Sequence, residues 1–220
     1  MASTARLDDP GALGGVLTGV SFIGGLATGL RLADAPFPRP GADVKDIQRF
    51  FQGDAWPERI NVGGQLLSAA SLAVFSTSVA RLAGRAGREA RALQAMAIIG
   101  GALASLSLAA SATAAAAFTG RPGREEHRAR SLHRLVFAAG GPVHGAGLAL
   151  LLGALGLAGR RTGALPGPLT TASLASAGVD ALAPVVLAVP RRLWSSRRGG
   201  SPPSSCSGSA ASAWPAARAD

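Results

Sequence analysis

Long stretches without a formally charged residue limit what this chain can fold into more than any other feature. A transmembrane helix needs about 20 consecutive apolar residues, because each residue adds about 1.5 Å and the hydrocarbon core of a bilayer is about 30 Å thick. Four uncharged stretches reach this length, and a fifth contains a single acid, Asp180. We therefore predict an all-α fold, a polytopic transmembrane helical bundle of about five spans, near residues 11–32, 60–80, 94–118, 135–158 and 165–189.

The charge composition also separates this chain from two other classes of protein. Only 15% of the residues are charged, whereas soluble domains carry about 25%. A soluble Ala/Gly-rich helical bundle would need charges on its outward faces, and the long stretches have none. The net charge of +10 is compatible with nucleic-acid binding, but the arginines flank apolar stretches and the chain has no Tyr for base stacking. We predict the lipid bilayer as partner, no nucleic acid, and a multi-pass location in the cell membrane.

The first apolar stretch is open to a second reading, as a cleaved secretory signal. The sequence Ala33-Asp34-Ala35 resembles a signal-peptidase site. However, the segment before the stretch is not basic, because Arg6 is opposed by two aspartates, and Arg31 interrupts the approach to the site. We predict a retained span over residues 11–32.

The longest polar connection, residues 33–59, contains a short amphipathic helix. Val44, Ile47 and Phe51 recur at helical spacing and form an apolar stripe. Such a helix could lie on the membrane surface, with Trp56 at headgroup depth, or pack on the bundle. Both arrangements are left open.

The remaining connections are short and rich in arginine, which predicts antiparallel neighbouring spans. Lys and Arg are more numerous on the side opposite the N-terminus, but the long first loop also carries acids, so the orientation stays open. We assign residues 1–194 to the transmembrane domain. The Ser/Pro-rich segment 195–220 cannot bury enough apolar surface to fold alone, and we predict that it is disordered.

Small and polar residues within the spans indicate how the helices associate. Gly11, Gly15 and Gly19 form one ladder of small residues, and Gly25 with Gly29 forms another. Either allows close packing with another helix of this chain, with other membrane helices or in a homo-oligomer. Asn61 and Gln65 lie four residues apart and predict a polar stripe that faces the bundle interior. The stripe either makes interhelical hydrogen bonds that hold the bundle together or forms part of a polar pathway.

His144 and Asp180 are the ionisable side chains well inside the apolar stretches. An unpaired Asp at the centre of a span costs about 2.5–3.5 kcal/mol, so it should find a partner or carry a proton. We expect a His144–Asp180 pair that is either a plain interhelical hydrogen bond or a proton or cation site. Together with Asn61 and Gln65 these residues form our predicted intramembrane polar site.

Signatures of catalysis, metal binding and cofactor binding are missing from the sequence. His127 and His133 do not have HExxH spacing, and the single cysteine, Cys206, has no partner. The segment 120–124 lacks the Gly-Lys-Ser/Thr ending of a phosphate-binding loop. We predict no catalytic residues, no metal, no cofactor and no enzymatic activity.

The fourth apolar stretch resembles a known group of proteins. The segment His133-Arg134-Leu135-Val136-Phe137, then Gly140-Gly141-Pro142-Val143-His144, and Gly159-Arg160-Arg161-Thr162-Gly163 are similar to multi-spanning integral membrane proteins of high-GC actinobacteria, which have no assigned activity. Members often carry a further C-terminal span, whereas this chain departs after Val189. The departure suggests a truncation or a shifted reading frame as a hypothesis. The resemblance implies a membrane protein and adds no mechanism.

Two functions from different classes remain from the sequence. The first is a non-catalytic membrane component, such as a subunit, scaffold or sensor. The alternative is a small proton- or ion-coupled transporter that uses the polar residues of spans two, four and five. The first predicts partner proteins, and the second predicts an ion-dependent flux.

Overall fold

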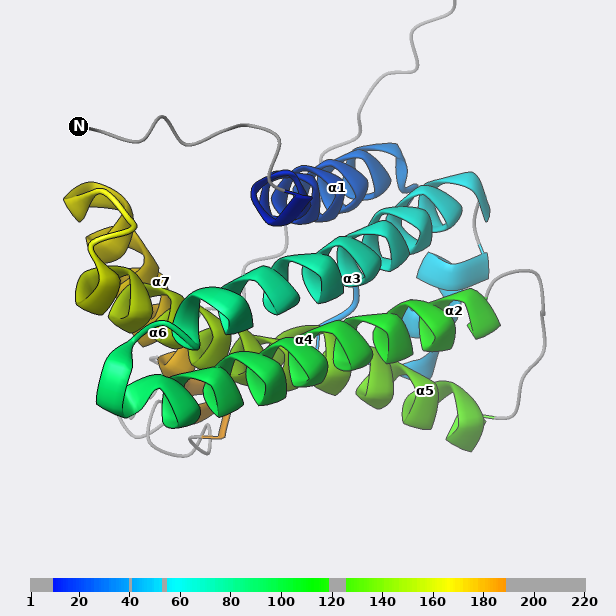
Figure 1. Ribbon diagram of the computed structural model, residues 1–220. Helices are drawn as coiled ribbons and strands as arrows, with labels where there is room; N and C mark the ends of the chain where they lie inside the picture. Colours follow the sequence, from blue (N-terminus) through cyan, green and yellow to red (C-terminus); the bar gives the residue numbers. More distant parts are fainter. Residues whose placement is uncertain (1–9, 40, 53–54, 119–125, 189–220) are drawn as a thin grey trace, which may run out of the picture. The chain divides into compact units, whose positions relative to one another are not determined.

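The computed structural model describes residues 10–39, 41–52, 55–118 and 126–188, and all regular structure within them is helical (Figure 1). The α-helices in chain order are α1 (Pro10–Leu32), α2 (Val44–Gln52), α3 (Ala55–Ala83), α4 (Ala90–Phe118), α5 (Glu126–Ala138), α6 (His144–Thr162) and α7 (Gly167–Ala188). A 3-10 turn, η1 (Gly87–Glu89), precedes α4, and a π-helical segment, η2 (Ala139–Val143), joins α5 to α6. The predicted tail 195–220 lies outside the described residues.

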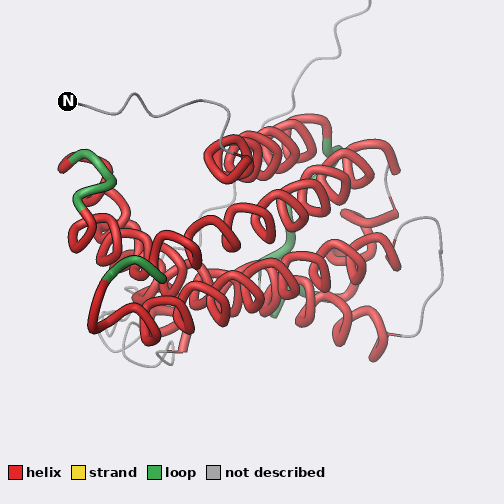
Figure 2. The backbone as a smooth tube through the Cα atoms, in the orientation of Figure 1, coloured by secondary structure: helices red, strands yellow, loops and turns green. Residues whose placement is uncertain are grey.

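Among the described residues, four helical segments are long and apolar enough to cross a membrane: Pro10–Leu32, Ala55–Ala83, Gly87–Phe118 and Glu126–Thr162. The predicted fold class is confirmed, and the chain is a membrane protein with a helical bundle. The fifth span, predicted over 165–189, coincides with α7, which is helical from Gly167 to Ala188 but is not among these four segments. Short loops connect most of the helices (Figure 2).

Helix α1 packs antiparallel on α3 through direct backbone contact. A Cβ atom added to Gly64 would lie 2.8 Å from the Cα atom of Gly25 and 2.6 Å from the carbonyl oxygen of Ser21, so only glycine fits there. Gly14 meets α3 near Ser71, farther along that helix. Of the two predicted ladders, Gly25 and Gly29 both lie against α3, whereas Gly19 of the other ladder has no neighbouring atom within 4 Å of its Cβ position. The tight contact is therefore made by residues later in α1.

Helices α3, α4 and α6 form the centre of the bundle. Leu72, Ala97, Ala104 and Leu151 are buried together where the three helices meet, and α7 packs against α6. Gly163, with φ of 64°, ends α6 and turns the chain toward α7. This arrangement gives the bundle two ends. The pocket end is where α1 finishes and α3 and α5 begin, and the arginine end is where α3 and α6 finish and α4 and α7 begin.

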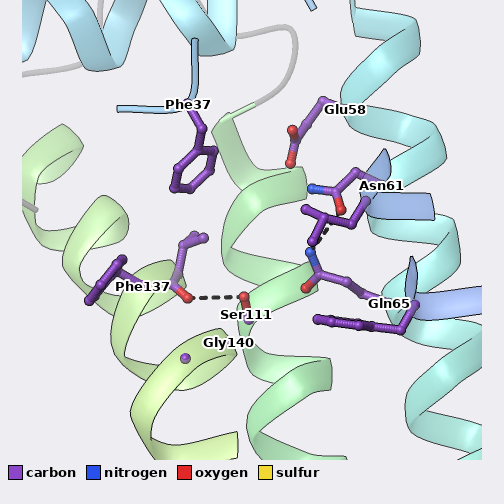
Figure 3. A pocket seen from close by; sticks show the side chains of 11 residues that line it. Phe37, Glu58, Asn61, Gln65, Ser111, Phe137 and Gly140 are labelled. Carbon is purple, nitrogen blue, oxygen red and sulfur yellow. Dashed lines mark hydrogen bonds between the residues drawn. The ribbon is translucent and has the colours of Figure 1, made fainter. Parts of the chain in front are cut away.

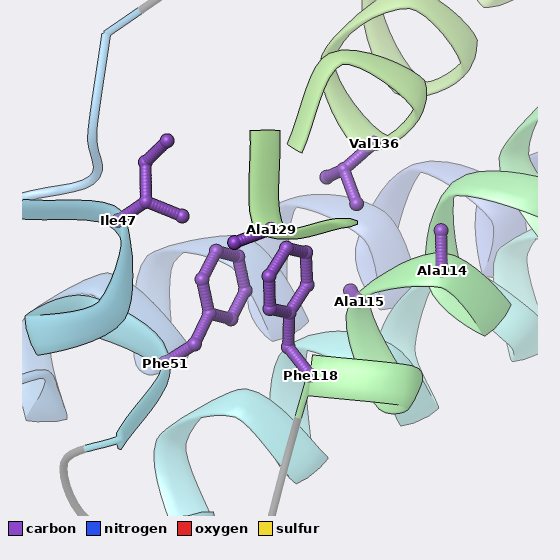
Figure 4. Packing of buried hydrophobic residues seen from close by; sticks show 7 residues of the cluster. All are labelled: Ile47, Phe51, Ala114, Ala115, Phe118, Ala129 and Val136. Carbon is purple, nitrogen blue, oxygen red and sulfur yellow. The ribbon is translucent and has the colours of Figure 1, made fainter. Parts of the chain in front are cut away.

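The short helix α2 packs on the pocket end of the bundle. Ile47 and Phe51 lie in a buried cluster with Phe118 of α4 and with Ala129 and Val136 of α5 (Figure 4). The Phe51 and Phe118 rings stack with their centroids 4.3 Å apart. Of the two arrangements predicted for this helix, the structure shows packing on the bundle.

Candidate functional site

A cavity of about 190 Å³, with a mostly apolar surface and four polar residues in its lining, lies at the pocket end. Residues of α1, α3, α4, α5 and η2 line it, together with Phe37 from the segment that follows α1 (Figure 3). The polar residues in the lining are Glu58, Asn61, Gln65 and Ser111, and the apolar ones include Phe22, Leu26, Phe37, Val136 and Phe137. We call this cavity the polar pocket.

The α3 wall of the polar pocket is a stripe of three buried polar side chains. Glu58, Asn61 and Gln65 are spaced at i, i+3 and i+7 and so share one face of the helix. The Gln65 amide Nε2–H donates a hydrogen bond to Asn61 Oδ1 at 3.1 Å. Asn61 in turn forms a side-chain hydrogen bond with the Glu58 carboxyl group. The sequence predicted Asn61 and Gln65 as an inward-facing pair, and the structure brings them together in the lining of this pocket.

Two polar groups of this stripe lack a partner, among the residues described, that would fully offset their burial. Gln65 is 8% exposed, and its Oε1 atom has no hydrogen-bond partner among the described residues. Glu58 is 7% exposed, and the ion pairs found in the described part of the chain, Glu126–Arg130 and Glu89–Arg161, do not include it. A buried carboxylate without a cationic partner is costly unless a cation or a proton accompanies it.

Glu58 was missed by the sequence analysis. It stands next to Arg59, at the end of the first polar connection, and was counted with that loop. The signal that could have found it is its position three residues before Asn61, on the same helical face as Asn61 and Gln65.

The opposite wall of the polar pocket contains η2. Ser111 of α4 donates its hydroxyl to the carbonyl oxygen of Val136 at 3.1 Å, one turn before η2. A Cβ atom at Gly140 would lie 2.6 Å from Ser111 Oγ, so a side chain there would displace the serine. Pro142 lies within η2 and has no N–H for the helical hydrogen-bond ladder. π-helical turns of this kind are frequent at functional sites.

A buried histidine of α5 holds in place the segment that contributes Phe37 to the polar pocket. His133 of α5 is buried, and its Nε2–H donates to the carbonyl oxygen of Pro38 at 3.2 Å. Phe37, the residue before Pro38, lies in the pocket lining. This contact of His133 was not predicted from the sequence. Its role here is to hold the 33–39 segment over the cavity.

His144 and Asp180, the other predicted site residues, lie outside the pocket lining. His144 is buried, its Nδ1–H donates to the carbonyl oxygen of Ala104 at 2.9 Å, and its ring stacks on Phe22 with centroids 5.9 Å apart. Asp180 is half-buried on the neighbouring α7 and interacts electrostatically with His144. A Cβ atom at Gly145 would lie 3.5 Å from the Asp180 carbonyl oxygen.

The two residues therefore face each other across the α6–α7 contact, while the hydrogen bond of His144 goes to α4. Phe22 links His144 to the polar pocket, because it both stacks on the imidazole and lines the cavity. A His144–Asp180 pair that binds a proton or cation stays a prediction.

Metal chemistry has no evident site in this region. Within the residues that the structure describes, no group of three His, Cys, Asp or Glu side chains gathers in a geometry that could hold a metal ion.

Comparison of the chain with protein-family models, with curated proteins and with solved structures finds no match. The resemblance of the fourth apolar stretch to actinobacterial membrane proteins therefore stays a prediction.

Proposed function

We propose that this chain is a non-catalytic protein of the cell membrane whose polar pocket binds a small cationic species, a proton or a small cation, at Glu58. The observation that carries the proposal is that Glu58 and Gln65 line the same cavity. A buried carboxyl group without an ion-pair partner in the described residues and a buried amide oxygen without a hydrogen-bond donor line one cavity. Ionisable groups inside a helical membrane bundle are costly and commonly mark ion or proton sites.

The chemistry of the lining favours a positively charged ligand. Glu58 supplies a carboxyl group and Gln65 supplies an acceptor oxygen, while Phe22 and Phe37 add aromatic rings. Aromatic faces attract cations, and a desolvated cation gains most from them. The volume of about 190 Å³ is below the range of about 300–1,000 Å³ that is usual for larger organic ligands. The ligand is accordingly a proton with a few waters, an alkali cation or a small ammonium ion.

Two roles follow from binding at this site. A protein that binds the cation and stays closed is a sensor or a regulatory subunit. A protein that also releases the cation to the other side is a small proton- or ion-coupled transporter, the second candidate. The observation that favours transport is η2, because a π-helical turn with Gly140, Gly141 and Pro142 interrupts the regular helix beside the pocket.

Ligand-dependent stability of the purified protein tests the binding step. Thermal unfolding in a neutral detergent would be followed across pH and across Li⁺, Na⁺, K⁺ and methylammonium at constant ionic strength. A ligand that binds only the folded state at one hundred times its Kd stabilises by about 2.7 kcal/mol. We expect the wild-type protein to be stabilised by protons or by one of these cations, and Glu58→Gln to fold without that response.

The matched control is Glu126→Gln, which removes an exposed carboxylate of α5 and should leave the response intact. A wild-type protein that responds to neither protons nor cations would overturn the proposal, as would an unchanged response in Glu58→Gln. Vesicles loaded with a pH-sensitive or cation-sensitive dye then separate the two roles. Flux that is lost in Glu58→Gln identifies a transporter, and binding without flux identifies a sensor or subunit.

A further inference from the structure

A second cavity lies at the arginine end, far from the polar pocket. It is a groove of about 550 Å³ between the start of α1, the end of α3, the end of α6 and the turn before α7. Its wall is apolar and is formed by Phe75, Val79, Leu82, Leu155 and Leu165. Helix α1 packs mainly on α3, so this groove is left between α1 and α6. We call it the arginine-end groove.

Two arginines stand in the lining of this groove. Arg81 lies in the last turn of α3 and Arg85 in the turn that follows the helix, and both line the groove. Both are exposed, and neither belongs to the ion pairs found among the described residues. Arg81 Nη2 donates to the hydroxyl of Ser78, another lining residue, at 2.6 Å. The groove thus offers two guanidinium groups that are free of acidic side chains beside an apolar wall.

The position of these arginines at and just after the end of α3 places them at headgroup level. The uncharged part of the helix runs from residue 60 to 80, which is about 30 Å at 1.5 Å per residue and matches the hydrocarbon core. Arg81 is the first charged residue after that stretch, and Phe75 and Val79 precede it. When α3 spans the bilayer, the apolar wall lies in the acyl region and the arginines lie among the headgroups.

The charge at this end selects the sign of the ligand. Six arginines lie in the turns and helix ends at this end of the bundle, where Glu89 is the acidic residue among those described. The arginines are Arg81, Arg85, Arg88, Arg91, Arg160 and Arg161. The guanidinium group binds phosphate oxygens through paired hydrogen bonds. Basic pockets between transmembrane helices are suited to anionic lipid headgroups. A free phosphate ion would satisfy the arginines but would leave the apolar wall uncovered.

We propose that the arginine-end groove binds an anionic glycerophospholipid. Its phosphate sits between Arg81 and Arg85, and one acyl chain lies along Phe75, Val79 and Leu155. The lipid fills the space between α1 and α6 and so tethers α1 to the rest of the bundle. This site is independent of the polar pocket, which lies at the other end of α3.

Lipid binding to the delipidated protein in a neutral detergent tests the proposal by native mass spectrometry and thermal unfolding. The probes are dioleoylphosphatidylglycerol, dioleoylphosphatidylcholine and inorganic phosphate. We expect the wild-type protein to retain and be stabilised by the phosphatidylglycerol more than by the phosphatidylcholine. The double variant Arg81→Gln/Arg85→Gln should bind the anionic lipid at least about tenfold more weakly, because each arginine near an anionic lipid raises the affinity about fivefold.

Two further variants separate the groove from general surface charge. Arg88→Gln/Arg91→Gln removes the same charge at the same end from residues that do not line the groove, and it should bind the lipid as the wild type does. Ala12→Trp fills the groove from α1 without a change of charge and should also weaken binding. Equal loss in both double-arginine variants would overturn the proposal. Equal binding of the two lipids, or full competition by inorganic phosphate, would overturn it as well.

Discussion

At the pocket end of the bundle a charged side chain is buried, whereas at the arginine end the charges are exposed. Glu58 lines the same cavity as Phe37 and has the neutral side chain of Asn61 as its partner, while Arg161 and Glu89 pair on the surface with about half of each side chain exposed. A buried charge has to be compensated by a ligand or by a proton, because the interior solvates it poorly. An exposed charge is compensated by water, counterions or lipid headgroups. Under our two proposals, the buried Glu58 binds a cation selectively at one end, and the exposed arginines attach the protein to lipid headgroups at the other.

The two ends also differ in how the bundle is closed. The pocket end is covered by α2 and by a cluster of stacked aromatic rings, whereas the arginine end is closed by short turns such as η1. Substitutions that target one end should therefore affect stability and binding differently from those at the other.

The largest expected effect comes from removing the aromatic cover. Phe51 is 5% exposed and stacks on Phe118, so Phe51→Ala should lower the free energy of unfolding by about 3–5 kcal/mol. Unfolding in mixed micelles with increasing SDS, followed by circular dichroism, measures this loss. The control is Leu106→Ala, which truncates an outward-facing side chain that is 70% exposed. The idea that the cover stabilises the pocket end fails if both variants lose the same free energy.

The next effect tests the wall that α1 contributes to the polar pocket. Gly64→Ala would push a methyl group into the backbone of α1 near Gly25, and overpacking of this kind costs about 1–3 kcal/mol. Gly63→Ala is the matched control, because no atom lies within 4 Å of its Cβ position and Ala is a better helix former than Gly by about 1 kcal/mol. SDS unfolding should therefore rank Gly64→Ala below the wild type and Gly63→Ala at or above it. The reverse order would contradict direct backbone contact between α1 and α3.

The sequence was sufficient for the fold class because the absence of charge over bilayer-length stretches is a local property. The approximate positions of four of the five predicted spans follow from it, while the fifth, α7, is helical but is not among the four long apolar segments. The contact between Gly25 and Gly64 does not, because a glycine pattern shows which face can pack closely but not which helix will pack there. In a chain this rich in glycine, the ladder that includes Gly19 was as plausible as the one that makes the contact.

The candidate site was predicted in part for a related reason. Asn61 and Gln65 were found because polar residues at helical spacing stand out within an apolar stretch. Glu58 was overlooked because a charged residue beside Arg59 resembles a loop end, and its burial depends on Phe37 and α5, which are distant in sequence. Ser111 looked like one small residue among many on α4. Its role depends on the π-helical turn opposite, and no local pattern indicated that turn.

The smallest expected effect concerns the exposed ion pair at the arginine end. Arg161 donates to the Glu89 carboxylate through Nη2 at 2.6 Å and through Nε at 3.2 Å, which joins the end of α6 to η1. Both side chains are about half exposed, so solvent screens the pair. A double-mutant cycle with Arg161→Gln and Glu89→Gln should give a coupling of about 0.2–1 kcal/mol, reduced further at about 1 M salt, where the screening length is about 3 Å.

The same cycle sharpens the contrast between the two ends. The response of the wild-type protein to protons or cations at Glu58 should persist in high concentrations of an inert salt, because the carboxyl group is buried and poorly accessible to screening ions. The Arg161–Glu89 coupling should decline under those conditions. A coupling above about 2 kcal/mol that salt does not weaken would mean that the arginine end is shielded from solvent. The reason for treating its charges as free to meet lipid headgroups would then be lost.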